Sequence, residues 1–442
     1  MKEFKEPVGI LGYGVEGQST LRYLQKNHVK SIVVFDQKKP AVQLDNVQYI
    51  YGPHYLEHLS LVKTLFRSPG IRSDLTSLTK FTESGGDLTS QTELFFNLVS
   101  QKRIIGVTGT LGKGTCCTMI KHVLEASKKP VILLGNIGTP LLDGLSEITE
   151  DTWILIELSS FQLSTLKKSP KYAIILKTTS EHMDWHLSQQ EYWEHKSHLV
   201  RQQKQEDVLI YYNDAKGSCW ISQQSPAKKV SVGKKADIRL EKDTVTCNNV
   251  SFSLHDFKVK GLFNLENLGA TLALGQKLNL NPTTVIQALK GFSGLEHRLE
   301  YVTTKNGVQF YNDSYATRPD ATIGAIQSFD NQSIGLILGG SEKHADFTDL
   351  VSTLLNTPHL VAIALIGVTA QRLYTLLTQE GKKSNFVIHH CDSLENAGDT
   401  LLSQLKKGVI LLSPACASFG LFANYKERGF AFKHWVNQLN KD

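Results

Sequence analysis

Short apolar runs alternate with segments of helix length along almost the whole chain. Runs of strand length include VGIL near the start, RIIGVTG, WILIELSS and YAIILKTT further on, and IGLILGG and GVILLSPA towards the end. A parallel strand that helices cover on both faces shows a continuous apolar run of this kind instead of strict alternation. The pattern therefore predicts an α/β protein built from parallel sheets and covering helices.

One segment has a different pattern. Between residues 230 and 264, polar and apolar residues alternate in VSVG, ADIRLEKDTVTC and VSFSL, and turn residues separate the runs. Alternation with a period of two is typical of strands that expose one face to water. We therefore expect a small antiparallel patch in this part of the chain.

The length and the polar breaks predict the domain organisation. A chain of 442 residues exceeds what a single hydrophobic core usually supports. Renewed alternation of strands and helices follows the polar stretch TKFTESGGDLTSQTE near residues 79–93, and follows GFSGLEHRLE near residue 298. We therefore expect three domains, formed by residues 1–88, 89–297 and 298–442.

Composition narrows the class of protein. Apolar residues make up 41% of the chain and charged residues 20%, which is ordinary for a globular protein. No apolar run approaches the roughly 20 residues that cross a bilayer. The start, MKEFKEPVGILGYG, mixes acidic and basic residues and fits neither a secretory signal nor a transit peptide. The expectation is a cytoplasmic protein that does not act in a membrane.

Cysteine spacing and charge exclude further classes. The six cysteines are scattered without a C-x-x-C pair, which argues against a zinc cage and against a disulfide framework. The net charge of +6 comes from 48 basic and 42 acidic residues spread along the chain. Because long basic runs are missing, we expect a small anionic ligand and no nucleic acid as partner.

The first candidate site is a glycine loop. The stretch GYGVEG, residues 12–17, follows VGIL and matches G-x-G-x-x-G, and Asp36 closes the next strand, where a ribose-binding acid is expected. Backbone amides and a helix N-terminus in such a loop bind a diphosphate, so NAD, FAD and a nucleotide-sugar diphosphate all remain possible ligands. By itself the loop suggests a nicotinamide-dependent oxidoreductase, and a turn without a ligand is the other alternative.

The second candidate site is the stretch IIGVTGTLGKGT, residues 104–115. An apolar strand, a glycine turn, Lys113 and a helical segment give the context of a P-loop, which surrounds the phosphates of a nucleoside triphosphate. The spacing departs from G-x-x-x-x-G-K-[ST], because Val107 stands in place of the first glycine and Gly114 in place of the metal-binding hydroxyl. A glycine turn with an exposed lysine is the alternative.

Together with further stretches, the two loops resemble the Mur ligases, in particular the branch that adds D-glutamate. The resemblance extends in family order over nearly the whole chain, and its most specific parts are ELSSFQL and LLSPACASFGLFANYKERGFAF, residues 157–163 and 411–432. The other stretches are SPGI (68–71), GNIGTP (135–140), EHMDWH (181–186), GLEHRLE (294–300), NDSYAT (312–317) and LGGSEKHADF (338–347).

The resemblance implies a fold and a reaction. Residues 1–88 would form a Rossmann-like domain that holds UDP, residues 89–297 a central ATP-binding domain, and residues 298–442 a Rossmann-like domain that binds D-glutamate. ATP would phosphorylate the carboxylate of UDP-N-acetylmuramoyl-L-alanine, and the amine of D-glutamate would displace the phosphate. Such transfer between anionic groups requires Mg²⁺, here two ions, and a lysine near the γ-phosphate. The enzyme would be a monomer that makes peptidoglycan precursors.

The resemblance also implies roles for single residues. The catalytic set is Lys113, Asn136, Glu157, His182 and Lys196; of these, Glu157, His182 and Lys196 would hold metal, with Lys196 carbamylated. The ATP set is Gly109, Thr110, Gly112, Lys113, Gly114, Thr115, Asn267, Arg298 and Asp313. The UDP-substrate set is Gly14, Val15, Glu16, Asp36, Gln37, Ser68, Pro69, Gly70 and Asn136. The D-glutamate set is Thr317, Lys343, Ser418 and Tyr425.

Each of these residues also has an ordinary alternative. Lys113 and Lys196 could be surface lysines, and Glu157 a solvated or capping glutamate. His182 and His186 are four residues apart and would share a face of a helix, which suggests zinc, but the H-E-x-x-H glutamate and a cysteine partner are both missing.

Several positions depart from the pattern of the family. Leu111 replaces an asparagine of the loop and Gly114 its hydroxyl residue, while Thr115 lies about 100° further around the helix. In the glutamate pocket Tyr315 replaces a lysine, and Arg318 stands nearby where an asparagine is usual. The other departures are Lys177 for Asn, Glu181 for Asp, Trp185 for Arg and Phe263 for His.

Alternative functions remain open at this point. An oxidoreductase would rest on the first glycine loop alone and leave the second without a role. A protein of the ligase fold that binds nucleotide without turnover would explain Leu111, Gly114 and Tyr315. A sister ligase that adds another amino acid is disfavoured by the SPACAS stretch. An active ligase is favoured, because Mg²⁺ keeps several waters and needs few protein ligands.

Overall fold

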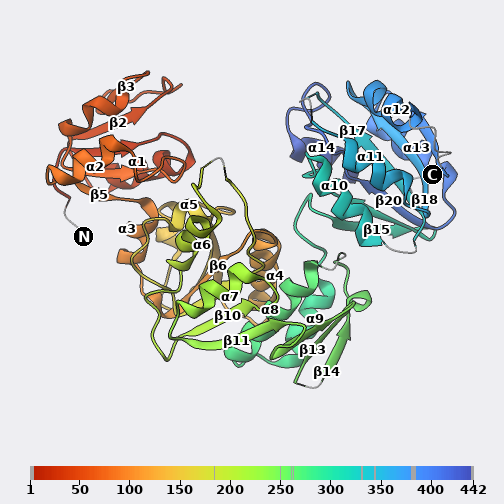
Figure 1. The fold of residues 1–442 in the computed structure, drawn as a ribbon, viewed down its shortest axis with the longest axis horizontal. Coiled ribbons are helices and arrows are strands. Elements are labelled where there is room, and N and C mark those ends of the chain that lie inside the picture. The colour runs from red at the N-terminus through yellow and green to blue at the C-terminus, as the bar shows by residue number, and fades with distance from the viewer. Residues whose placement is uncertain are drawn as a thin grey trace. The chain divides into compact units, whose positions relative to one another are not determined.

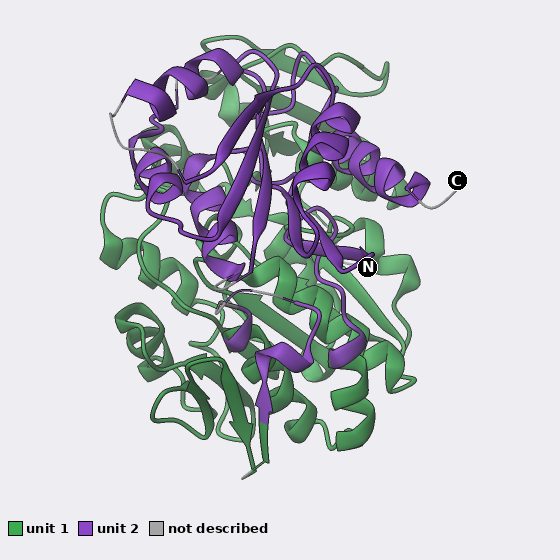
Figure 2. Cartoon of the chain, turned by 90° about the vertical axis from the view of Figure 1, so that its right-hand side faces the viewer, with its two compact units in different colours: residues 1–251, 266–289 green, residues 252–265, 290–442 purple. Residues whose placement is uncertain are grey.

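The computed structural model of the protein describes residues 4–183, 185–248, 250–259, 261, 263–329, 332–342, 345–379 and 385–439. The chain forms two compact units, shown in two colours in Figure 2. The first unit contains Met1–Ser251 and Glu266–Leu289, and the second contains Phe252–Leu265 and Lys290–Asp442.

The first sheet of unit 1 has five strands in the order β3-β2-β1-β4-β5, and all neighbouring strands are parallel. Its central strands are continuous apolar runs that are buried on both faces, as the sequence predicts. The strands are β1 (Val8–Leu11), β2 (Ile32–Asp36), β3 (Gln48–Tyr51), β4 (Thr64–Arg67) and β5 (Asp87–Thr89), and the helices that follow in this part are α1 (Val15–Lys26), α2 (Thr76–Glu83) and α3 (Gln91–Leu98). In Figure 1 this part is red to orange.

The second sheet has nine strands in the order β14-β13-β12-β11-β10-β9-β6-β8-β7. Neighbours from β12 through to β7 are parallel, whereas β12 and β13 pair antiparallel, within the segment where alternation predicts such a patch. The strands are β6 (Ile104–Thr108), β7 (Val131–Gly135), β8 (Trp153–Glu157), β9 (Tyr172–Ile175), β10 (Val208–Tyr212), β11 (Lys228–Gly233), β12 (Ile238–Glu241), β13 (Thr244–Cys247) and β14 (Val250–Ser253). The helices are α4 (Lys113–Ala126), α5 (Ser160–Leu163), α6 (Gln189–Ser197), α7 (Lys216–Gln223), α8 (Phe263–Lys277) and α9 (Pro282–Gly291).

The third sheet, in unit 2, has six strands in the order β15-β16-β20-β17-β18-β19. Only the edge strand β15 is antiparallel to its neighbour. The strands are β15 (Glu300–Lys305), β16 (Val308–Asn312), β17 (Ile334–Gly339), β18 (Leu360–Ile366), β19 (Val387–His390) and β20 (Gly408–Leu412), and the helices are α10 (Pro319–Ile326), α11 (Thr348–Leu355), α12 (Ala370–Gln379), α13 (Leu394–Gln404) and α14 (Tyr425–Gln438).

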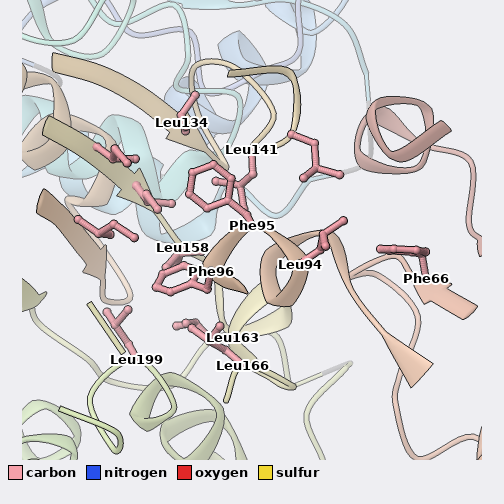
Figure 3. Close-up of a cluster of buried hydrophobic side chains, with 14 of the residues drawn as sticks. Phe66, Leu94, Phe95, Phe96, Leu134, Leu141, Leu158, Leu163, Leu166 and Leu199 are labelled. Atoms are coloured by element: carbon pink, nitrogen blue, oxygen red, sulfur yellow. The ribbon is translucent and has the colours of Figure 1, made fainter. Parts of the chain in front are cut away.

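One hydrophobic core joins the two sheets of unit 1. Helix α3 contributes Leu94, Phe95 and Phe96, which are fully buried. Figure 3 shows these side chains in one cluster with Phe66 of β4, with Leu134 of the second sheet and with leucines of the segments that connect its strands. Burial of such large side chains stabilises this arrangement, at about 1.5–3 kcal/mol for each. The loops after β1 and β6 therefore belong to one packed body.

The α/β class with mostly parallel sheets is confirmed, while the three domain boundaries stay a prediction. Across the described part of the chain, every helix is too short or too polar to cross a bilayer.

Candidate active site

The turn after β6 places a glycine where a side chain would not fit. Gly112 has φ 82°, in the left-handed region that favours glycine, and helix α4 begins at the next residue. A Cβ on Gly112 would lie only 2.8 Å from Oδ1 of Asn267. Helix α8 therefore brings Asn267, for which the resemblance implies contact with adenine, against the loop after β6.

Two lysines meet at this loop. Nζ of Lys113 donates hydrogen bonds to the carbonyl oxygens of Gly109 and Thr110, both at 2.9 Å. Nζ of Lys196, from α6, donates to the same Gly109 oxygen at 2.9 Å and to Oγ1 of Thr108 at 3.2 Å. The structure thus brings together two predicted catalytic residues that are far apart in sequence.

Lys196 is buried, with 1% of its surface exposed. Burial lowers the pKa of its amine well below the usual value, and the charge of Lys113 lowers it further. The ring of Tyr192 lies 4.6 Å from Nζ of Lys196 and covers it. Sequence reasoning missed Tyr192, although its spacing of four residues from Lys196 on one helix was a usable signal.

The loop is also supported from the strand next to β6. The backbone N–H of Thr110 donates to the carbonyl of Lys177 at 2.9 Å, and Oε2 of Glu266 accepts from the N–H of Lys177 at 3.3 Å. Burial raises the pKa of Glu266 to about 7. Oγ1 of Thr110 lies 3.1 Å from the hydroxyl of Tyr192 and accepts from the N–H of Thr179 at 3.0 Å. These contacts hold the loop in place, and Glu266 is a second residue that sequence reasoning missed.

Glu157 ends β8, beside β6 and β7. Its Oε1 accepts a hydrogen bond of 2.8 Å from Nδ2 of Asn136, so two predicted catalytic residues lie in contact. The residue is buried, and no described group donates a hydrogen bond to Oε2. A buried carboxylate oxygen without a donor is costly unless a cation binds it. The donor chemistry of this position therefore fits Mg²⁺, which prefers carboxylate oxygens.

His182 lies differently from the other predicted metal ligands. It is half-exposed, its φ is 57°, and its ring lies 4.9 Å from that of Phe161. Within the described residues, no three or more His, Cys, Asp or Glu side chains are arranged to hold a metal ion. The described residues of 181–188 form turns and bends, so the helical face that the zinc alternative requires is not there.

His186 is instead a buried part of an aromatic cluster. Its Nε2 lies 2.9 Å from Oγ of Ser160, and its ring stacks on Phe161 with a centroid distance of 5.6 Å. Burial lowers the pKa of His186 and of His195 to about 4, so both rings are neutral near pH 7.

The first glycine loop lines a cavity of about 430 Å³ in the first sheet's part of unit 1. Every predicted UDP-binding residue except Asn136 lines this cavity. Tyr13, Tyr55 and Ile71 also line it, and sequence reasoning did not predict them as binding residues. A Cβ on Gly17 would lie 2.1 Å from the carbonyl oxygen of Gly12, which explains the third glycine of the motif. Asp36 accepts from the backbone N–H of Tyr13 at 2.7 Å and of Lys38 at 2.8 Å, so it supports the loop itself.

Two side chains connect this cavity to α5. Oε1 of Glu16 accepts a hydrogen bond of 2.6 Å from Nε2 of Gln162, whose own Oε1 accepts from the N–H of Ser159. Buried Arg67 donates to the carbonyls of Ser68, Pro69 and Ile71, and to Oγ of Ser164 at 2.8 Å. Burial lowers the pKa of Arg67 to about 10 and raises that of Glu16. Hydrogen bonds thus link the cavity of the first glycine loop to α5 and its flanking residues, which follow the strand that carries Glu157.

In unit 2, Asp313 is buried and contacts the segment that contains Arg298. Its Oδ2 accepts from Oγ of Ser413 at 2.7 Å and its Oδ1 from the N–H of Leu299 at 3.0 Å. Burial raises the pKa of Asp313 to about 7.

Two of the predicted D-glutamate residues of unit 2 lie at the start of α14 and on the loop before it. Tyr425 begins α14 and its ring meets that of Tyr315 at 5.0 Å, while Ser418 is buried on the preceding loop. The N–H of Thr317 donates to the carbonyl of Tyr315 at 2.8 Å. Lys343 lies outside the described residues. Sequence reasoning missed Arg428 of α14, which is buried. Its guanidinium group donates to Oγ of Ser314 at 3.0 Å and to the carbonyl oxygen of Ser314 at 2.9 Å.

The fold and the loop after β6 define an α/β protein of the nucleotide-binding class. Residues 107–275 match the Mur ligase middle domain and residues 297–416 match the Mur ligase glutamate ligase domain. The chain belongs to the Mur ligase family, so the family and the ligase class predicted from sequence are confirmed.

Curated relatives match over nearly the full length. UDP-N-acetylmuramoylalanine--D-glutamate ligase of Acetivibrio thermocellus is 34% identical, over 98% of this chain and 96% of the relative. The protein of that name from Clostridioides difficile is 32% identical, over 97% and 98%.

Solved structures agree on the fold. UDP-N-acetylmuramate-alanine ligase from Thermotoga maritima superposes with a TM-score of 0.59 at 17% identity, covering 98% of this chain and 99% of that one. The MurF ligase of Thermotoga maritima in complex with ADP gives a TM-score of 0.56 at 15% identity, covering 97% and 95%.

Proposed function

We propose that the chain is the ATP-dependent ligase that joins D-glutamate to UDP-N-acetylmuramoyl-L-alanine in peptidoglycan precursor synthesis. The observation that carries this proposal is the identity of 30–34% to ligases of that name over 97–99% of the chain. The setting we propose is the cytoplasm, with the enzyme acting as a monomer on small-molecule substrates.

The reaction has two steps. A carboxylate oxygen of the UDP substrate attacks the γ-phosphorus of ATP, an O–P bond forms, and ADP leaves with the electrons of the bond that breaks. The amine nitrogen of D-glutamate then attacks the acyl carbon, phosphate leaves, and the nitrogen loses its proton to give the amide. Positioning and electrostatic stabilisation supply most of the catalysis in such transfers.

The loop after β6 would bind ATP. Backbone N–H groups at the start of α4 and the ammonium group of Lys113 suit the β- and γ-phosphates. Asn267, which lies against Gly112, would contact the base, and Arg298 and Asp313 would contact the nucleotide from unit 2. Lys113 leaves the Gly109 and Thr110 carbonyls when it turns to a phosphate oxygen.

Glu157, His182 and Lys196 would hold Mg²⁺, with Glu157 offering its unpartnered Oε2. When bound, Mg²⁺ neutralises phosphate charge during transfer. The missing hydroxyl at Gly114 leaves one ligand position to water or phosphate oxygen.

Lys196 would act as a carbamate. Burial lowers the pKa of its amine and so favours the neutral form, and a neutral amine adds CO₂ and then loses a proton. The product is a carboxylate next to the nucleotide loop, in place of a buried ammonium group. Incubation with ¹³C-labelled CO₂ would give a carbamate NMR signal that Lys196→Met lacks.

The two organic substrates would bind to different units of the chain. The cavity around Gly14, Glu16 and Ser68 would take the UDP part, with Asn136 near the reacting carboxylate. Thr317, Lys343, Ser418 and Tyr425 would bind the carboxylates of D-glutamate through cation and hydroxyl donors.

The test is phosphate release from ATP and Mg²⁺ with UDP-N-acetylmuramoyl-L-alanine, with and without D-glutamate. We expect release that depends on D-glutamate and not on L-glutamate or L-lysine, and a product heavier by one glutamate residue in mass spectrometry. Lys113→Met should lower kcat at least about 100-fold, because it removes a charge that stabilises the transferring phosphate.

A second candidate function rests on Leu111 and Gly114, which replace an asparagine and the hydroxyl residue of the loop. A protein that binds ATP without turnover would retain ATP affinity and release no phosphate with any amino acid. That result would refute the ligase proposal.

A further inference from the structure

The segment around Arg298 in unit 2 has an unusual backbone. The residues on both sides of Arg298 have positive φ, 64° at His297 and 45° at Leu299. Non-glycine residues rarely take this conformation, because the Cβ atom then lies too close to the following carbonyl oxygen. Such a conformation persists only where neighbouring groups hold it, and it is enriched at functional sites.

The segment 313–315 provides the groups that hold it. The N–H of Tyr315 donates to the carbonyl of His297 at 2.9 Å, and the N–H of Leu299 donates to Oδ1 of Asp313 at 3.0 Å. Hydrogen bonds on both sides therefore fix the Cα of Arg298 relative to Tyr315.

The side chains of the two residues are also in contact. The guanidinium carbon of Arg298 lies 3.8 Å from the centroid of the Tyr315 ring, the shortest cation–ring distance among the described residues. No described residue accepts a hydrogen bond from this guanidinium group or forms an ion pair with it. The ring thus covers one face of the cation, while its N–H edge remains available to an anion.

The ring of Tyr315 also contacts a second aromatic ring. It meets the ring of Tyr425 at 5.0 Å and 88°, and Tyr425 in turn meets His297 at 6.0 Å. Tyr315 is nevertheless 43% exposed, so its burial alone does not account for a large aromatic side chain at this place.

We propose that Tyr315 is the positioning residue for Arg298, holding the guanidinium plane against its ring so that the N–H edge meets the phosphates of ATP. This inference rests on the proposed function for the role of Arg298, and adds the residue that orients it. A stacked guanidinium loses less conformational freedom when it binds an anion than a free one.

The experiment measures affinity for the β,γ-methylene analogue of ATP by calorimetry, which requires no turnover. Tyr315→Leu replaces the ring with an apolar side chain and should weaken binding about 5-fold. Tyr315→Phe keeps the ring and should retain most of the wild-type affinity. Tyr374→Leu, which removes another partly exposed tyrosine of unit 2, is the matched control and should leave affinity unchanged.

Fluorination separates the ring's charge distribution from its shape. Phenylalanine with one, two and three fluorines at position 315 has nearly constant size, but the negative potential of its face falls at each step. The dissociation constant should rise stepwise along this series, and KM for D-glutamate should not follow it. In a cycle with Arg298→Ala, Tyr315→Leu should have no further effect.

Two outcomes would overturn the inference: equal affinity across the fluorinated series, or a full effect of Tyr315→Leu in the absence of Arg298. The wild-type ligase assay is independent of both. If ligation is absent while the series behaves as expected, the proposed function fails and the positioning of Arg298 stands. If ligation is present and the series is flat, the inference alone fails.

Discussion

Asp313 makes the stability of unit 2 depend on pH. The residue is buried, with 8% of its surface exposed, and burial raises the pKa of its carboxyl to about 7 from the ordinary 3.8. The folded protein therefore keeps a proton that the unfolded chain releases near pH 4. By linkage, the free energy of unfolding of the wild type falls as the pH rises from about 4 to 7, and the loss is complete above pH 7.

Asp313→Asn removes this dependence. The amide still accepts from the N–H of Leu299, and the hydroxyl of Ser413 can rotate to accept from the new NH₂ group. At about 1.36 kcal/mol for each pKa unit, the two-unit interval from pH 5 to pH 7 corresponds to about 3 kcal/mol. The stability of Asp313→Asn relative to the wild type should therefore rise by about 3 kcal/mol between pH 5 and pH 8.

The measurement must report on unit 2 alone, because burial also raises the pKa of Glu266, in unit 1, to about 7. Trp435 is the one tryptophan in the unit 2 part of the sequence, and it is buried. Urea unfolding of protein labelled with 5-fluorotryptophan, followed by the ¹⁹F signal that Trp435→Phe removes, isolates this unit.

A matched control is Asp349→Asn, which changes an exposed aspartate in the first turn of α11 and should leave the pH profile parallel to that of the wild type. Parallel profiles for Asp313→Asn and the wild type between pH 5 and pH 8 would refute the reasoning. So would a variant that loses stability relative to the wild type as the pH rises.

Three other changes test the site in unit 1. Glu157→Gln removes the charge but keeps the shape, so kcat should fall about 100-fold and a higher Mg²⁺ concentration should be required. The control Glu150→Gln, at an exposed glutamate, should change neither kcat nor the Mg²⁺ requirement. Chelation of Mg²⁺ should stop turnover of the wild type reversibly. Gly112→Ala forces a side chain into φ 82° and towards Asn267, so ATP affinity should fall at least about 10-fold in calorimetry, and unchanged affinity would contradict the geometry. Glu16→Ala breaks the bond to Gln162 and should raise KM for the UDP substrate about 5-fold, with Glu16→Gln restoring it because the amide oxygen still accepts; equal KM values for the two variants would exclude the link.

The sequence by itself determined the α/β class and the two glycine loops. Continuous apolar runs mark buried parallel strands. Glycines at fixed spacing mark either a left-handed turn residue, as at Gly112, or a close backbone contact, as at Gly17 against Gly12. These signals are local, because a few neighbouring residues determine a strand, a turn or a helix start.

The family motifs also indicated which side chains to examine, but not how they meet. Lys113 and Lys196 share the carbonyl oxygen of Gly109, although 87 residues separate Gly109 from Lys196. They meet because β6 lies between β9 and β8 in the sheet, an order that the sequence of strands does not reveal.

Only the tertiary structure decided the finer placement of the site. It put Glu16 against Gln162, Glu157 against Asn136 and the ring of Tyr315 over Arg298, and it placed His182 in a turn instead of on a helix. Contacts of this kind depend on packing between elements distant in the chain, where complementary shape and burial decide the outcome. No periodicity or local spacing records them, since the partners share no common element of secondary structure.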